Sequence, residues 1–81
     1  LKVQPNPTQG QVEVILPAGI IVSEQQEGRL ELYDLKGQLI RTTALTGPST
    51  TWQIGELPDG VYLLRYTNGG AILAAKVIIQ H

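Results

Sequence analysis

Short runs of alternating apolar and polar residues, separated by turn-forming residues, repeat along the whole chain. The run from Val61 to Thr67 is the clearest, since it places Tyr62, Leu64 and Tyr66 on one face and the intervening residues on the other. A period of two is the pattern of a β-strand, whereas a helix needs apolar residues three and four positions apart. No window keeps a helical stripe over three turns, so we expect an all-β fold.

The alternation predicts seven strands. They are expected over residues 11–16, 20–22, 29–35, 38–46, 51–54, 61–67 and 71–80. Short strands that repeat about every 8 to 12 residues indicate a seven-stranded antiparallel Greek-key β-sandwich of the immunoglobulin-like type. Val12, Val14 and Leu16 are expected to face its core, together with Trp52 and Ile54.

Four segments carry residues that favour turns or bends. In Pro5–Pro7 the prolines fix φ and lack an N–H, which predicts a bend. Asp34–Gly37 fits a type I turn, with an aspartate that bonds back to its own backbone and a glycine at positive φ. Leu57–Gly60 predicts a second turn, after which the Tyr62 hydroxyl is expected to tie down the loop as a tyrosine corner. Asn68–Gly69 predicts the two central residues of a type I′ hairpin.

The charged and nucleophilic residues favour no catalytic or metal site. Six basic and seven acidic residues are scattered without runs, so the positive field that nucleic-acid binding requires is missing. There is no cysteine, and the one histidine, His81, is expected to be a solvated residue at the end of the chain. Asp34 and Asp59 lack the spacing of a calcium loop, and the other carboxylates are expected in turns and on solvated faces. We therefore expect no enzymatic activity, no cofactor and no nucleic-acid partner.

Residues 1–81 are expected to form a single domain. The chain contains no methionine and begins with Leu1, which indicates a fragment of a larger protein. Its apolar runs, such as Val77–Ile79, are too short to cross a bilayer. The missing cysteines leave the cellular compartment open.

Four segments, taken in order, resemble the C-terminal sorting domain of the type IX secretion system, the Por secretion system type A family. They are Pro5–Pro7 followed by Gly10, then 32–37, 57–65 and 76–79, and they span nearly the whole chain. Each motif alone is common in hairpins, but the four in this order are specific. Two positions depart from the family pattern: Gln38 stands where arginine is frequent, and Lys76 is the only basic residue near the end, where the family often has two.

The resemblance implies that the domain is a substrate and a signal. It is expected at the C-terminus of a cargo protein of a Gram-negative bacterium, where it crosses the periplasm and is recognised by the outer-membrane translocon and shuttle proteins of the type IX system. A cell-surface sortase is then expected to cleave it and attach the cargo to the surface. By position, the resemblance assigns the sorting-motif residues Pro5, Asn6, Pro7, Gly10, Asp34, Gly37, Leu57, Gly60, Tyr62 and Arg65, and a terminal recognition strand of Lys76, Val77, Ile78 and Ile79.

The last predicted strand, 71–80, supports two interpretations. It is apolar on both faces except for Lys76, so it can lie at a sheet edge and pair with a strand of the translocon or, in an edge-strand dimer, of a second copy. Alternatively, Val77–Ile79 simply fill the core. For the whole chain, the alternative function is a passive fibronectin-like spacer or binding module of a multidomain extracellular protein. A lectin-like domain would need exposed aromatic residues, and Trp52 is expected in the core.

Overall fold

The computed structural model describes residues 1–17, 28–45, 47–69 and 71–81. Within these ranges the chain forms seven strands and no helix: β1 (Lys2–Gln4), β2 (Gln11–Ile15), β3 (Gly28–Tyr33), β4 (Leu39–Leu45), β5 (Ser49–Gln53), β6 (Gly60–Asn68) and β7 (Ala71–Ile79). A three-stranded sheet has the order β1-β2-β5 and a four-stranded sheet the order β4-β3-β6-β7, with antiparallel neighbours throughout. The prediction of an all-β fold is confirmed. In the described ranges we accordingly find no helix of membrane-crossing length and apolarity.

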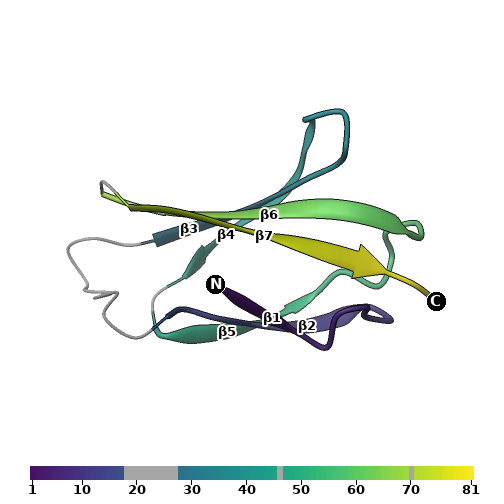
Figure 1. Cartoon of the computed structure of the whole chain (residues 1–81), viewed down its shortest axis with the longest axis horizontal. Helices are drawn as coiled ribbons and strands as arrows, with labels where there is room; N and C mark the ends of the chain where they lie inside the picture. The colour runs from purple at the N-terminus through teal and green to yellow at the C-terminus, as the bar shows by residue number, and fades with distance from the viewer. Residues whose placement is uncertain (18–27, 46, 70) are drawn as a thin grey trace.

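The two sheets lie face to face as layers, and the core lies between them (Figure 1). The buried apolar residues are Val12, Val14, Leu16, Leu30, Leu32, Leu45, Trp52, Ile54, Tyr62, Leu64, Tyr66, Val77 and Ile79. Every residue predicted from the alternation to face inward is among them. Each such side chain contributes about 1.5–3 kcal/mol by leaving water, which makes this layer the main source of stability.

The predicted strands from residue 29 onward, and the one over 11–16, are found within a few residues of their expected bounds. The strand predicted over 20–22 lies outside the described residues. β1 was not predicted, because alternation over three residues is too short to be recognised. It forms because Lys2–Gln4 pairs with β2 and brings Leu1 and Val3 against the core.

The hairpin between β3 and β4 is built as predicted. The Asp34 carboxylate accepts the backbone N–H groups of Lys36 at 2.9 Å and Gln38 at 3.0 Å, and the N–H of Gly37 donates to the Asp34 carbonyl at 3.1 Å. Gly37 has the expected positive φ, at +86°. A register shift at the end of β3 precedes the turn. Figure 1 shows the resulting hairpin tip rising from the outer side of the four-stranded sheet, away from the other layer.

The β6–β7 hairpin is displaced by one residue from the prediction. Asn68 pairs with Ala71, so Asn68 is the last residue of β6 and not a central residue of the turn. Gly69 has a φ of +58°, whereas Asn68 has no positive φ. The correction has a simple physical cause, because a glycine reaches the left-handed region without the steric cost that an asparagine meets.

The segment before β6 also differs from the prediction. A backbone hydrogen bond of 3.2 Å closes a turn over Ile54–Leu57, and Gly60 already pairs with Ile79 as the first residue of β6. The carbonyl of Pro58 accepts a hydrogen bond of 2.7 Å from the Tyr62 hydroxyl. This contact confirms the predicted tyrosine corner.

Candidate functional site

The segment Pro5–Thr8, hereafter the crossover segment, passes from the three-stranded sheet to the edge of β7 in the other sheet. Thr8 forms a parallel bridge with Ile79. The N–H of Thr8 donates to the carbonyl of Ile78 at 2.8 Å, and the carbonyl of Thr8 accepts the N–H of Gln80 at 2.8 Å. The C-terminal half of the β7 edge is therefore already paired within the chain.

Asn6 extends this pairing with its side chain. Its Nδ2 donates to the carbonyl of Lys76 at 2.8 Å, and its Oδ1 accepts the N–H of Ile78 at 3.0 Å. Pro5 and Pro7 have no N–H, so the side-chain amide supplies the donor and the acceptor that a strand backbone would otherwise offer. Both X–Pro peptide bonds in the segment are cis. The entry motif assigned by resemblance thus lies directly against the assigned terminal strand.

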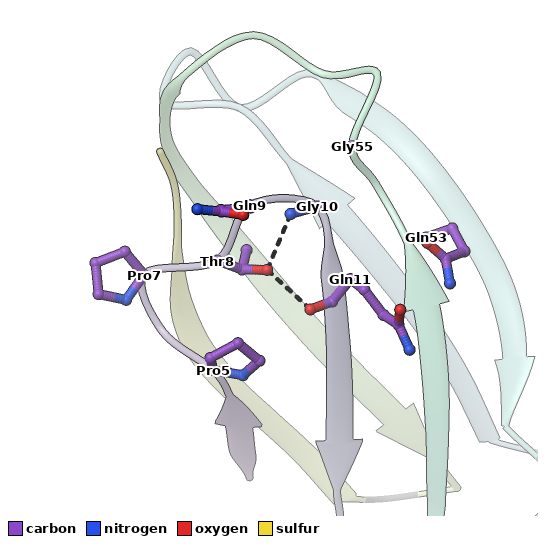
Figure 2. A pocket seen from close by; sticks show the side chains of 8 residues that line it. All are labelled: Pro5, Pro7, Thr8, Gln9, Gly10, Gln11, Gln53 and Gly55. Carbon is purple, nitrogen blue, oxygen red and sulfur yellow. Dashed lines mark hydrogen bonds between the residues drawn. The ribbon is translucent and has the colours of Figure 1, made fainter. Parts of the chain in front are cut away.

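Thr8 and Gly10 hold the crossover segment in place (Figure 2). The buried Thr8 hydroxyl donates to the carbonyl of Gln11 at 2.8 Å and accepts the N–H of Gly10 at 3.1 Å. Gly10 has a φ of +143°, and a Cβ there would lie 2.5 Å from the Cα of Gly55, so only glycine fits. A hollow of about 600 Å³ beside them is lined by Pro5, Pro7, Thr8, Gln9, Gly10, Gln11, Gln53 and Gly55. This lining offers amides and a hydroxyl but no titratable side chain, so it suits hydrogen bonding and not acid–base chemistry.

A second hollow, hereafter the outer groove, lies between the β3–β4 hairpin tip and the outer face of β6 and β7. Its volume is about 430 Å³, and its lining residues are Tyr33, Asp34, Leu35, Gly37, Val61, Tyr62, Leu63, Arg65 and Lys76. Asp34, Gly37, Tyr62, Arg65 and Lys76, all assigned by resemblance from three separate motifs, therefore meet around one groove. The resemblance gave their positions along the chain but no signal that they converge.

The sequence analysis did not predict that Leu35 and Leu63 form an exposed apolar surface in the outer groove. Leu35 is 78% exposed and Leu63 is 45% exposed, although both are large and apolar. Two features of the sequence could have indicated their exposure. Leu63 has an outward position in its alternating strand, and Leu35 lies inside a turn.

Arg65 is the centre of a small polar cluster at the rim of the outer groove. It donates to the Glu31 carboxylate at 2.9 Å and to the Tyr33 hydroxyl at 2.8 Å, and its guanidinium lies 5.2 Å from the centre of the Tyr33 ring. The hydrogen bond from Arg65 lowers the pKa of Glu31, and desolvation raises the pKa of Tyr33. The cluster is a neutral pair with an oriented tyrosine, so it leaves no net charge at this rim.

The terminal strand has features of both interpretations drawn from the sequence, core filling and an exposed recognition strand. Val77 and Ile79 are each 1% exposed and fill the core. Lys76 and Ile78 alternate with them and do not belong to the core. No described residue pairs with the ammonium group of Lys76. Core filling and an outward face therefore coexist in one strand.

His81 is not the free tail residue that was predicted. Its Nδ1 contacts the Asp59 carboxylate, its Nε2 lies 2.8 Å from the Gly55 carbonyl, and its backbone N–H donates to Asp59 at 3.2 Å. The hydrogen bond between the two side chains raises the pKa of His81 and lowers that of Asp59. The last residue is fixed to the loop before β6, which sequence alternation cannot reveal.

The remaining assigned residues have structural positions. Leu57 packs against the core and Gly60 begins β6, and neither is among the residues that line the two hollows. Trp52 is 9% exposed and belongs to the core, as predicted, so its ring is not available to stack against a sugar. Among the described residues, no three His, Cys, Asp or Glu side chains lie close enough together to hold a metal ion.

Comparison with known families gives one match. The family model described as "Secretion system C-terminal sorting domain" matches residues 2–80 of this chain. A search of curated proteins finds no match. The matched range includes the crossover segment, the outer groove and all of β7.

Proposed function

The chain belongs to the family of secretion system C-terminal sorting domains of the type IX system, and from this premise we propose that it directs a cargo protein across the outer membrane. The family is a secretion signal and not a class of catalysts, and its signal implies interaction with the secretion machinery and export to the cell surface or the extracellular space. The observation that carries the proposal is the extent of the match, from residue 2 to residue 80.

The finer steps of the proposal follow the family route. The domain stands as one unit at the C-terminus of its cargo, crosses the periplasm, and is recognised there by the outer-membrane translocon and its shuttle proteins. A cell-surface sortase then removes it and attaches the cargo to the surface.

We also propose that the two sheets form a Greek-key sandwich of immunoglobulin-like topology. The tyrosine corner of Tyr62 supports this assignment, as do the chain connections that pass between the sheets from β2 to β3, from β4 to β5 and from β5 to β6.

The test is the export of a reporter protein. A periplasm-directed reporter is fused in front of residues 1–81 and produced in a Gram-negative bacterium with a type IX system. We expect the reporter in the medium or on the surface, and we expect it to remain periplasmic when the domain is omitted or the translocon is deleted. A sortase-deficient strain should accumulate the uncleaved fusion, which a mass measurement detects. Equal retention of the reporter with and without the domain would contradict the proposal and favour a passive spacer.

Deletion of Val77–Gln80 is not a clean test of recognition. Val77 and Ile79 are core residues, so their removal costs about 2–5 kcal/mol each from cavity formation and unfolds a domain of this size. Loss of export in that deletion would report unfolding. Substitutions of exposed side chains are therefore needed to separate recognition from folding.

A further inference from the structure

The outer groove exposes apolar surface that the fold itself does not need. Leu35 and Leu63 line it at 78% and 45% exposure, beside Val61 and the ring of Tyr33. Water contact with such a surface costs free energy, and contiguous exposed apolar patches on small proteins mark interaction sites. Residues of the hairpin tip line the groove together with residues of β6 and β7, and Figure 1 shows that tip rising from the four-stranded sheet.

The charges around the outer groove indicate which chemical group a bound partner would present there. The Oδ1 atom of Asp34 accepts two backbone N–H groups of its own turn, and the charge of Arg65 is balanced by Glu31. Lys76 in the lining and Lys36 in the exposed tip make no ion pair with a described residue. Asp34 keeps its negative charge, so Asp34 (−1), Lys36 (+1) and Lys76 (+1) leave a net charge of +1 at the groove, which complements a carboxylate.

Two lysines favour a protein over an anionic membrane. Attraction to a lipid surface generally takes a cluster of about four to eight basic residues, since each one contributes only about 1 kcal/mol. The whole chain carries a net charge of −1 and no such cluster. A single well-placed ammonium beside an apolar groove instead matches one side-chain carboxylate beside one apolar side chain.

We propose that the outer groove is the receptor-binding surface of this sorting domain, and that it takes an extended segment of a partner protein in which an apolar side chain enters the groove beside a carboxylate that pairs with Lys76. The inference rests on the proposed function, because it names the surface through which the export machinery reads the domain. It places recognition on a face of the sheet, and not on the β7 edge that the crossover segment already occupies.

The apolar part is tested with the reporter fusion described above. The double variant Leu35→Ser/Leu63→Ser is compared with Leu39→Ser/Ile72→Ser, which replaces two leucine or isoleucine residues of similar exposure outside the groove lining. We expect at least a tenfold loss of export for the groove variant, the size of effect seen for central interface residues, and less than a twofold change for the control. Protease resistance of each fusion must equal that of the unmodified fusion, which verifies folding.

The charged part is tested by Lys76→Glu, Lys76→Arg and Lys2→Glu in the same fusion. We expect Lys76→Glu to lower export by about tenfold, and Lys76→Arg and Lys2→Glu to retain it, since Lys2 carries the same charge on the opposite sheet. Normal export of Lys76→Glu would overturn the carboxylate, and normal export of the Leu35→Ser/Leu63→Ser variant would overturn the groove. Failure of the unmodified fusion to leave the periplasm would instead overturn the proposed function.

A vesicle assay distinguishes a lipid from a protein partner. The unmodified fusion and Lys76→Glu are sedimented with vesicles of equal parts phosphatidylglycerol and phosphatidylcholine. We expect neither to sediment above the level seen with phosphatidylcholine alone. Sedimentation of the unmodified fusion that Lys76→Glu abolishes would overturn the assignment of a protein partner.

Discussion

At the scale of single residues, the assigned motif positions have distinct physical reasons to be what they are. Gly10 is required by a close approach of two backbones, Gly37 by a left-handed turn conformation, and Tyr62 by a hydrogen bond to a carbonyl four residues earlier. Lys76 has no such internal reason, since its side chain makes no described contact that the fold needs. Lys76 is therefore the assigned position that the proposed partner would contact, although a lysine on an edge strand also discourages unwanted strand addition.

Substitution of Gly10 by alanine should be strongly destabilising. The new Cβ would lie 2.5 Å from the Cα of Gly55 at a φ of +143°, and backbone atoms cannot move aside cheaply. We expect the free energy of unfolding to fall by about 2–3 kcal/mol, measured by urea denaturation. The matched control is Gly47→Ala, where nothing lies within 4 Å of the added Cβ and the change should stay within about 0.5 kcal/mol. Equal effects of the two substitutions would contradict the close approach.

At the scale of elements, β7 contains the assigned terminal strand and contacts the crossover segment, which contains the assigned residues Pro5, Asn6 and Pro7. One side of it pairs with β6 over its full length, from Ala71 to Ile79. Its other side is covered by the crossover segment only from Lys76 to Gln80. Covering an edge in this way prevents unwanted strand addition, so the crossover segment protects the part of β7 that the family resemblance assigns to recognition.

The substitution Asn6→Ala tests this protection. It removes both side-chain hydrogen bonds to β7, and because the site is exposed we expect a loss of only about 1 kcal/mol in the free energy of unfolding. The sharper readout is amide hydrogen exchange, which should become faster at the N–H of Ile78. Gln9→Ala serves as the control, since this exposed amide makes no hydrogen bond with a described residue. Unchanged exchange at Ile78 would show that Asn6 does not cover the edge.

The sequence was sufficient to predict most of the strands, but it did not predict the contacts between residues far apart in the chain. Alternation found the strands from β2 to β7 and their inward faces, because a half-buried strand leaves a local pattern in the sequence. The turn after β6 was predicted one residue too early, because Asn68 and Gly69 both favour turns but only Gly69 has a positive φ. The pairing of Asn6 with β7 joins residues 70 positions apart, and no local pattern encodes it. The outer groove was out of reach for the same reason, since it needs the register of β3, β6 and β7 together.

At the scale of the whole molecule, its two ends are fixed to the body of the sandwich. β1 pairs with β2 at the start of the chain, and His81 lies between Asp59 and Gly55 at the end. The resulting structure is held by backbone pairing and a thin core and contains no cysteine. A domain of this size has a small margin of stability, so even the weak pair of His81 and Asp59 should have a measurable effect on it.

The stability should depend on pH through His81 and Asp59. Contact with Asp59 raises the pKa of His81 above 6.5, so its contribution is complete below pH 6.5 and is lost as the pH rises through the raised value. Asp59, whose pKa is lowered from 3.8, contributes above that pH and loses its contribution as the pH falls through the lowered value. We expect the urea midpoint to decline above pH 6.5 by a small amount that salt reduces, because both groups are partly exposed. His81→Gln should flatten this decline, and an identical slope in that variant would exclude the pair as its cause.

The crossover segment also determines how mechanical load travels through the domain. Tension applied at Leu1 loads the pairing of β1 with β2 first and then, along the crossover segment, its hydrogen bonds with β7, two from the side chain of Asn6 and two from the backbone of Thr8. These bonds lie in series between the entering chain and the last strand. We expect a steady pull on a reporter fused in front of Leu1 to separate β1 from β2 and then the crossover segment from β7, before the two sheets separate. A domain under traction would then present a longer open strand than the same domain at rest.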